Sequence, residues 1–244
     1  MTPKAWIKAR IHPLVWERLG QAKQEYEWTR KKWQCESNLI PIFEKYLGFH
    51  NGFYVDVGSN DGRSHSNTYD LEFKLGWNGV LVEPIMHLFF RSRQIRNLES
   101  NSFFNCACVS PQFNSDHVEL LYSGSMTVSK SQIQEYEPNA WAKTGSQFLS
   151  RGEIVQSSWS SARTLESILI DSKSPKVIDL LSIDVEGAEF GVLLGLDLIS
   201  RKFRYILIET NLNSKAYEYL IRNEYLHIET IAQNLLFRHE SELQ

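Results

Sequence analysis

Four acidic residues lie at the ends of apolar runs, and carboxylates gathered in this way could bind a positively charged ligand or act as a base. They are Asp56, Glu83, Asp184 and Glu209. Each run has the length of a buried strand, and the carboxyl ends of parallel strands share one edge of a sheet, outside which ligands bind. Any one of these acids could instead cap a helix or pair with a surface cation. Four at one edge would raise one another's pKa values, and that cost favours a functional site.

A glycine turn follows the first of these runs, in the stretch Phe53-Tyr-Val-Asp-Val-Gly-Ser-Asn-Asp-Gly62. A buried strand that stops at such a turn and opens a helix is typical of pockets for nucleotide-like ligands. The turn lacks the lysine of a phosphate-binding loop, and its glycines are spaced G-x-x-x-G instead of G-x-G-x-x-G. Glu83 lies 83 − 62 = 21 residues after Gly62, where a doubly wound fold places the carboxylate that binds ribose hydroxyls. S-adenosylmethionine, which combines a ribose, an amino group and a positive sulfonium, therefore fits this acidic edge.

The hydrophobic pattern predicts alternating strands and helices. Strands are expected near residues 53–57, 79–83, 103–109, 178–184 and 205–211, with a short one at 118–121 and a closing hairpin of 226–231 and 234–238. Helices are expected near residues 38–47, 66–76, 86–98, 164–169, 186–196 and 214–222. Thr164 is expected to cap one helix and Gly76 to end another. Arg91, Arg93 and Arg96 are interpreted as a solvated helix face.

Two segments differ from this alternating pattern. Residues 1–49 predict an N-terminal helical extension, and residues 1–33 carry eight basic and three acidic side chains, a net charge of 8 − 3 = +5. This arm could contact a membrane surface, an anionic substrate or a second copy in a homo-oligomer, but a helix packed by its aromatic stripe on the domain explains it more simply. Residues 123–163, rich in serine and containing Trp141 and Trp159, predict a lid or specificity loop.

Composition excludes several classes of protein. A formal net charge of −3 over 244 residues disfavours a general nucleic-acid binder, and no apolar run reaches the ~20 residues of a transmembrane helix. The N-terminus has no apolar signal core, and three cysteines without metal-ligand spacing fit unpaired thiols in a reducing cytoplasm. We therefore expect a cytoplasmic protein with no bound metal.

Several ordered motifs together resemble the FkbM family of S-adenosylmethionine-dependent methyltransferases. They are Val55-Asp-Val-Gly-Ser-Asn-Asp-Gly62, Ser66-Asn-Thr68, Gly76-Trp-Asn-Gly-Val-Leu-Val-Glu-Pro84, Thr164-Leu165 and Leu180-Leu-Ser-Ile-Asp-Val-Glu-Gly-Ala-Glu189. The resemblance covers roughly residues 50–240 and implies a methyltransferase domain at 50–244. It implies an α/β class I (Rossmann-like) fold with a seven-stranded mixed sheet flanked by helices. It also implies O-methylation of a hydroxyl on a sugar, glycan or other natural product.

The resemblance further implies where the cofactor binds. Glu83 would hold the ribose, the residues around Cys106 and Ala107 would flank the adenine, and Asp184 would face the methyl group. The full set of expected cofactor-binding residues is Asp56, Gly58, Ser59, Asn60, Asp61, Gly62, Asn67, Glu83, Pro84, Cys106, Ala107 and Asp184. From the residues alone, Cys106 and Cys108 are more simply small core side chains.

Methylation of a hydroxyl requires a base. Asp184 is the first candidate, followed by Glu186 and by His65, a residue type that often acts as a base but that also fits an exposed loop histidine here. Two other functions stay open: a catalytically silent interaction module of the same fold, and a nicotinamide-dependent oxidoreductase, which the G-x-x-x-G turn disfavours.

Overall fold

The structure is a computed structural model that describes residues 35, 37–132, 137–149 and 152–243. The helices expected between residues 1 and 34, together with their proposed contacts, lie outside these residues. The described residues belong to one compact unit, Cys35–Gln244. The expected boundary between an extension and a catalytic domain at residues 49 and 50 stays a prediction.

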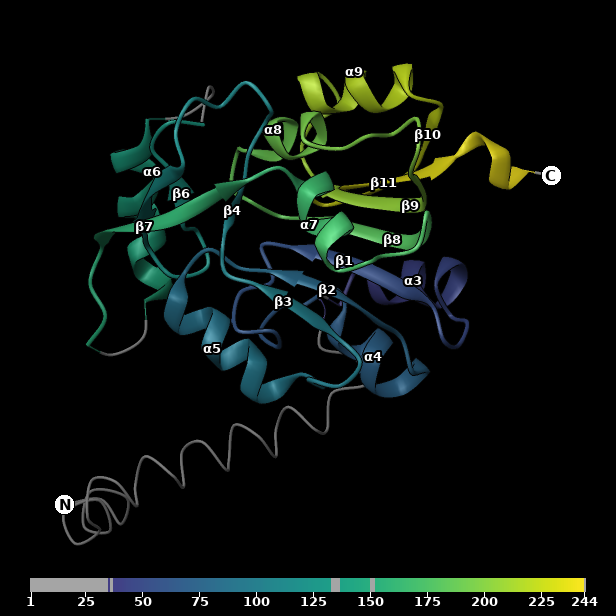
Figure 1. The fold of residues 1–244 in the computed structure, drawn as a ribbon, viewed down its shortest axis with the longest axis horizontal. Helices are drawn as coiled ribbons and strands as arrows, with labels where there is room; N and C mark the ends of the chain where they lie inside the picture. The colour runs from purple at the N-terminus through teal and green to yellow at the C-terminus, as the bar shows by residue number, and fades with distance from the viewer. Residues whose placement is uncertain (1–34, 36, 133–136, 150–151, 244) are drawn as a thin grey trace, which may run out of the picture. The chain divides into compact units, whose positions relative to one another are not determined.

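A seven-stranded mixed sheet with the order β10-β11-β9-β8-β1-β2-β3 forms the centre of this unit (Figure 1). Its five parallel strands are β1 (Phe53–Val57), β2 (Asn78–Val82), β3 (Ser102–Phe104), β8 (Val177–Ile183) and β9 (Lys202–Glu209). The hairpin of β10 (Tyr225–Ile231) and β11 (Asn234–His239) adds two antiparallel strands beside β9. The sheet expected from the sequence, including the closing hairpin, is confirmed.

Helices cover both faces of the sheet because successive strand residues point to opposite sides. Val55 and Val57 share a buried cluster with residues of α7 (Leu165–Asp171), α8 (Glu189–Leu194) and α9 (Lys215–Arg222). Tyr54 points the other way, where its hydroxyl donates to Glu72 on α4 (Tyr69–Leu75) at 2.8 Å. Further helical elements of this unit are α3 (Ile40–Tyr46), α5 (Met86–Ile95) and the short 3-10 turn η2 (Glu240–Leu243). The unit is therefore a three-layer α/β sandwich.

The local signals for helix ends hold. Thr164 caps α7 by accepting a hydrogen bond from the Ser167 N–H, and Gly76 ends α4 in the left-handed conformation at φ 70°. Both positions were expected from residue type, because a hydroxyl satisfies a free N–H and glycine tolerates positive φ.

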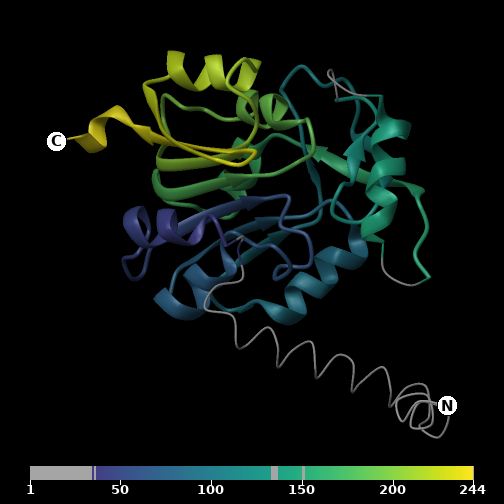
Figure 2. The ribbon, with the colours of Figure 1, turned by 180° about the vertical axis from the view of Figure 1, so that it is seen from behind.

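A second sheet of four strands, in the order β4-β7-β5-β6, lies beside the first. It comprises β4 (Ala107–Cys108), β5 (His117–Tyr122), β6 (Val128–Ser129) and β7 (Gln156–Arg163). With α6 (Pro138–Gly145) and the 3-10 turn η1 (Ser146–Phe148), β5, β6 and β7 form what we call the inserted subdomain, residues 117–163. Figures 1 and 2 show it at the side of the unit away from the C-terminus.

The inserted subdomain corrects two expectations. The segment 123–163 is not a loop throughout, since β6, α6 and β7 lie within it; its role as a lid stays a prediction. The strand expected at 103–109 is split into β3 and β4, which belong to different sheets. Between them the Asn105 side-chain amide donates to the carbonyls of Glu83 and Pro84 at 2.8 and 3.0 Å, which fixes the break.

Candidate functional site

Gly58 brings three strands of the large sheet together at the end of β1. Its N–H and that of Ser59 donate to the carbonyl of Val82 at the end of β2, at 3.0 and 3.1 Å. Its φ is +88°, and a Cβ at this position would lie 1.9 Å from the carbonyl oxygen of Asp184 after β8. Only glycine fits such a backbone and such a close approach, so the turn can pass directly over the β8 end.

Glu83 connects this turn to the end of β2. One carboxylate oxygen accepts from the Asn60 N–H at 2.9 Å and the other from the Ile85 N–H at 2.7 Å. The side chain is buried, and this burial raises the pKa of Glu83 to about 7, although the two N–H donors act in the opposite direction. Glu83 therefore holds the turn in place and also presents a buried carboxyl group to the space beside it.

Asp61 and Gly62 shape the turn instead of lining a cavity. The Asp61 carboxylate accepts from the N–H groups of Arg63 and Ser64, at 3.0 and 2.7 Å, and from the Ser64 hydroxyl. Gly62 has a φ of +78°, and a Cβ there would meet Ser92 of α5 at 2.6 Å. Neither residue is among those that surround the cavity described below, so their expected direct contact with a cofactor finds no support in the geometry.

Arg96 holds the glycine turn in place through buried hydrogen bonds. The expectation that Arg91, Arg93 and Arg96 form one solvated face is therefore wrong for Arg96. Its side chain is buried and pairs with Glu72 at 2.5 Å, while its guanidinium also donates to the Gly62 carbonyl at 2.8 Å and to Thr68 at 3.0 Å. Thr68 in turn donates to Asp56 at 2.5 Å. Arg91 and Arg93 are exposed, as expected. Arg96 is therefore a structural cation whose charge reaches the buried acids of the site.

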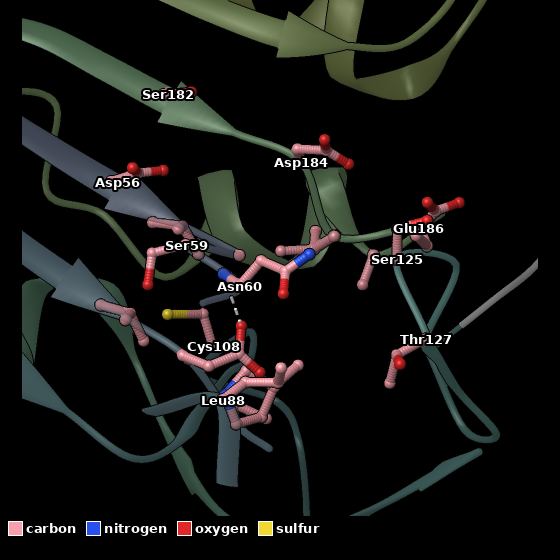
Figure 3. A pocket seen from close by; sticks show the side chains of 18 of the residues that line it. Asp56, Ser59, Asn60, Leu88, Cys108, Ser125, Thr127, Ser182, Asp184 and Glu186 are labelled. Atoms are coloured by element: carbon pink, nitrogen blue, oxygen red, sulfur yellow. Dashed lines mark hydrogen bonds between the residues drawn. The ribbon is translucent and has the colours of Figure 1, made fainter. Parts of the chain in front are cut away.

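A cavity with about 1020 Å³ of empty space, open to solvent, lies at the ends of β1, β2 and β8 (Figure 3). Most of the residues expected at a cofactor or catalytic site surround it: Asp56, Gly58, Ser59, Asn60, His65, Asn67, Glu83, Pro84, Cys106, Ala107, Asp184 and Glu186. Figure 3 shows Asp56 and Ser59 at one end, Asn60 in the middle, and Glu186 with Ser125 at the other end.

Small and apolar side chains line part of the cavity. Cys106, Ala107 and Cys108 are buried, and Leu88 joins them. Burial raises the pKa of Cys106 to about 12, and that of Cys108 is also far above the usual range, so both thiols stay protonated. These cysteines behave as small apolar side chains, which would suit the flat face of an aromatic base.

Carboxylates gather at the other end of the cavity. Asp184 follows β8 and shares a hydrogen bond with Glu209 at the end of the neighbouring β9. Burial raises the pKa of Glu209, and the charges of Asp184 and Glu186 and this hydrogen bond raise it further. Burial and the charge of Asp184 raise the pKa of Glu186 to about 8. Glu189 has a different role, because it accepts from the N–H groups of Val185 and Gly187 at 3.3 and 2.9 Å and so closes the turn before α8.

His65 and Asn67 come from the end of the glycine turn. His65 is exposed at the cavity with a φ of 58°, which leaves its interpretation as a loop histidine in place. The Asn67 amide donates to the Ser182 hydroxyl on β8 at 3.1 Å, so Asn67 joins the turn to the sheet.

A family model for the methyltransferase FkbM domain matches residues 56–238, which is well over half of the chain. The chain belongs to the FkbM methyltransferase family. None of the curated proteins matches it. Among solved structures, it is similar to methyltransferase FkbM from Methylobacillus flagellatus KT, with 11% identity and a TM-score of 0.40 over 78% of this chain and 44% of that one. It is also similar to the METTL16 MTase domain, with 12% identity and a TM-score of 0.43 over 82% and 66% of the two chains. This FkbM chain thus spans less than half of the first of these structures.

The residues of this FkbM cavity fit the groups of S-adenosylmethionine. The hydroxyl of Ser59 is buried on the cavity wall and makes no hydrogen bond to any described residue, so a polar ligand group would satisfy it. Asp56 and Glu83 are buried acids of the same cavity, and a cationic ligand would offset the free-energy cost of burying their negative charges. A ribose would find an acceptor in Glu83 and a base would find an apolar wall at Cys106 and Ala107.

The inserted subdomain contributes cavity residues that were not singled out from the sequence, although the segment 123–163 as a whole was expected to be a lid or specificity loop. Ser125 and Thr127 from the turn between β5 and β6, and Gln132 after β6, line it. The turn is held by its own hydrogen bonds, since Thr127 donates to the Gly124 carbonyl and Ser123 to the Met126 carbonyl. No periodic signal marks these residues, because their place depends on the pairing of β5 with β7 more than 30 residues later.

The described residues contain no group of three or more His, Cys, Asp or Glu side chains placed to hold a metal ion. None of the helices that the structure describes combines the length and the apolar character of a membrane span.

Proposed function

We propose that the protein is an S-adenosylmethionine-dependent O-methyltransferase whose acceptor is a hydroxyl of a sugar, a glycan or another natural product. The observation that supports it best is the meeting, in one cavity, of the Gly58 turn, the buried carboxyl of Glu83 and the buried Ser59 hydroxyl that lacks a partner among the described residues. Membership of the FkbM family supports methyl transfer in general. The choice of oxygen as the methylated atom follows from the family resemblance.

In this proposal the two ends of the cavity have different tasks. Glu83 accepts hydrogen bonds from the ribose, and Asp56, Gly58, Ser59 and Asn60 surround the amino-acid part of the cofactor. When bound, S-adenosylmethionine supplies a methyl group that an acceptor oxygen can attack in line with the carbon–sulfur bond.

The acceptor lies at the other end, near Asp184 and Glu186, whose carboxylates can orient its hydroxyl and take the proton as the oxygen becomes acidic. Asp61 and Gly62 contribute by fixing the turn.

Calorimetry with S-adenosylmethionine tests the proposal directly. The wild-type protein should bind the cofactor, and Glu83→Ala should lower the affinity by at least about tenfold, because hydrogen bonds to a buried charged acceptor contribute on the order of 1.5–3 kcal/mol. Glu99→Ala, at an exposed position near α5, is the matched control and should bind as the wild type does. Unchanged affinity in Glu83→Ala would refute the ribose assignment. Absence of binding by the wild-type protein would favour the interaction module instead.

A further inference from the structure

The turn between β8 and α8 holds Glu186 in a backbone conformation that residues other than glycine rarely adopt. Its φ is 54°, in the left-handed region, and Gly187 follows at 96°. The Glu189 carboxylate fixes this arrangement by accepting from the N–H groups of Val185 and Gly187 on either side of Glu186. Such strained residues persist only where the surroundings enforce them, and they occur preferentially at functional sites.

The Glu186 side chain is held a second time, by the inserted subdomain. The indole Nε1–H of Trp141 on α6 donates to Glu186 Oε2 at 3.0 Å, across 45 residues of sequence. Both residues are partly buried, and Glu186 lines the cavity at the end where Ser125 and Thr127 also lie (Figure 3). Trp141 therefore fixes where the carboxylate stands relative to the cavity.

The groups around Glu186 determine when it is ionised. It faces Asp184 at the end of β8, Glu189 on α8, Glu209 at the end of β9 and the indole of Trp141 on α6. Burial first, and the charges of Asp184 and Glu189 after it, raise the pKa of Glu186 to about 8, while the Trp141 hydrogen bond lowers it. A base is most effective when its pKa lies near the working pH.

We propose that Glu186 is the base that takes the acceptor's proton and that Trp141 is the positioning residue that holds its carboxylate for this step. The proposal rests on the proposed function. Glu186 receives the hydroxyl proton and becomes a neutral carboxyl group, while the oxygen's electron pair forms the new bond to the methyl carbon and the carbon–sulfur pair leaves with sulfur. Asp184, the first candidate from the sequence, is already engaged with Glu209, which makes it the weaker choice.

The hydrogen bond can be tested without an acceptor, by carbon NMR of protein labelled at the glutamate side-chain carboxyl carbon. The Glu186 signal is assigned by its loss in Glu186→Gln. In the wild type it should titrate near pH 8. In Trp141→Phe the midpoint should rise by about one pH unit, because a donor to the ionised form is removed. Trp159→Phe, which changes an exposed tryptophan of the same subdomain, should leave the midpoint unchanged.

A midpoint that is unchanged or lower in Trp141→Phe would overturn the role of Trp141. If that variant does not fold, the indole N–H signal of Trp141 provides the reciprocal measurement: it should move with pH in the wild type and become insensitive in Glu186→Gln. An indole signal that is equally insensitive in the wild type would also overturn it.

The role of Glu186 as base is tested by methyl transfer from S-adenosylmethionine to a panel of simple glycosides over a range of pH. The rising limb of the profile should shift upward in Trp141→Phe by the same amount as the NMR midpoint, with cofactor affinity unchanged. Glu186→Gln should lower transfer at least about 100-fold, and Asp184→Asn should lower it less. A larger loss in Asp184→Asn would overturn the assignment. A wild-type protein that binds no cofactor and transfers no methyl group would instead refute the proposed function, while the NMR midpoint would still decide the role of the Trp141 hydrogen bond.

Discussion

The ionisation of Glu83 should control how tightly the protein binds S-adenosylmethionine, and pH can test this. Its two oxygens accept backbone N–H groups, and burial raises its pKa to about 7. Only the ionised form can accept from the N–H groups and from a ribose at once, and only that form attracts a cation. We expect the affinity for S-adenosylmethionine to fall by up to about tenfold from about pH 8 to about pH 6. Calorimetry at the two pH values measures this, with Glu83→Gln as a variant that should bind weakly at both. A wild-type affinity that does not change with pH would contradict the assignment.

Arg96 is buried in an ion pair, whereas Arg91 and Arg93 on the helix just before it are exposed. Replacing one partner of a buried ion pair leaves the other charge unpaired, here Glu72. We expect Arg96→Met to lower the free energy of unfolding by about 3–5 kcal/mol, and Arg93→Met on the exposed face to change it by less than about 0.5 kcal/mol. Urea unfolding of the two variants measures both values. Similar stabilities would show that the Arg96 network is not needed for the fold.

The burial of Arg96 could not be predicted from the sequence, for a physical reason. Its partners Tyr54, Glu72 and Thr68 lie 42, 24 and 28 residues away, and no local spacing connects them. Asp56 and Glu83 were predictable because each follows an apolar run and strand ends converge in a parallel sheet. The fixed conformation of Glu186 depends on Glu189 and Trp141 and could only come from the structure.

At the scale of elements, the turn after β1 was predictable because all its signals are local. A buried strand ends at Gly58, and the glycine is required both by its φ of +88° and by the Asp184 carbonyl. Gly58→Ala should therefore abolish cooperative folding or cofactor binding. Gly152→Ala is the matched control, because its φ is +94° with no atom within 4 Å, and should cost only about 1–2 kcal/mol of backbone strain. Thermal unfolding of the two variants distinguishes steric conflict from strain. Equal effects would mean that the β8 contact is unimportant.

The strands of the inserted subdomain gave weaker signals. β7 reads Gln-Ser-Ser-Trp-Ser-Ser-Ala-Arg, with most of its side chains at least partly exposed, and it is held by pairing with β5 on one side and β4 on the other. Such a strand has no apolar alternation from which it could be recognised. The Asn105 hydrogen bonds that separate β3 from β4 are likewise invisible in a hydrophobic pattern.

At the scale of the whole molecule, the large sheet and the inserted subdomain each contribute residues to the candidate site. The sheet supplies Asp56, Glu83 and Asp184 from its strand ends, and the subdomain supplies Ser125 on the cavity wall and Trp141, which donates to Glu186. The core of the fold could be predicted because its strands are long apolar runs. The strands of the subdomain could not, so Ser125, Thr127 and Gln132 were not singled out, although Asp184 and Glu186 beside them were predicted and 123–163 was expected to be a lid or specificity loop.

The collection of buried acids also makes the stability of the whole unit depend on pH. Glu83 and Glu189 have pKa values raised to about 7, and Glu186 to about 8, from an ordinary value of 4.5. Between pH 4.5 and about pH 8 the folded protein holds protons that the unfolded chain has released. The free energy of unfolding is therefore greatest at low pH and decreases as the pH rises through the pKa values of the folded state. Hydrogen bonds from Lys130, Ser200 and Lys45 lower the pKa values of Glu119, Asp197 and Glu229, and these groups act below this window.

We therefore expect the Tm of the cofactor-free protein to fall by several degrees from about pH 5.5 to about pH 8.5. Saturating S-adenosylmethionine should raise the Tm more at the higher pH, because binding to the folded state favours the ionised acids that the cation faces. Glu189→Gln, which keeps an acceptor for the Val185 and Gly187 N–H groups, should make the pH dependence shallower. Glu99→Gln, at an exposed position, should leave it unchanged. Scanning calorimetry at the two pH values measures the Tm of the wild type without and with S-adenosylmethionine and of the two variants. A wild-type Tm that rises with pH over this range would contradict the burial of these carboxyl groups in protonated form.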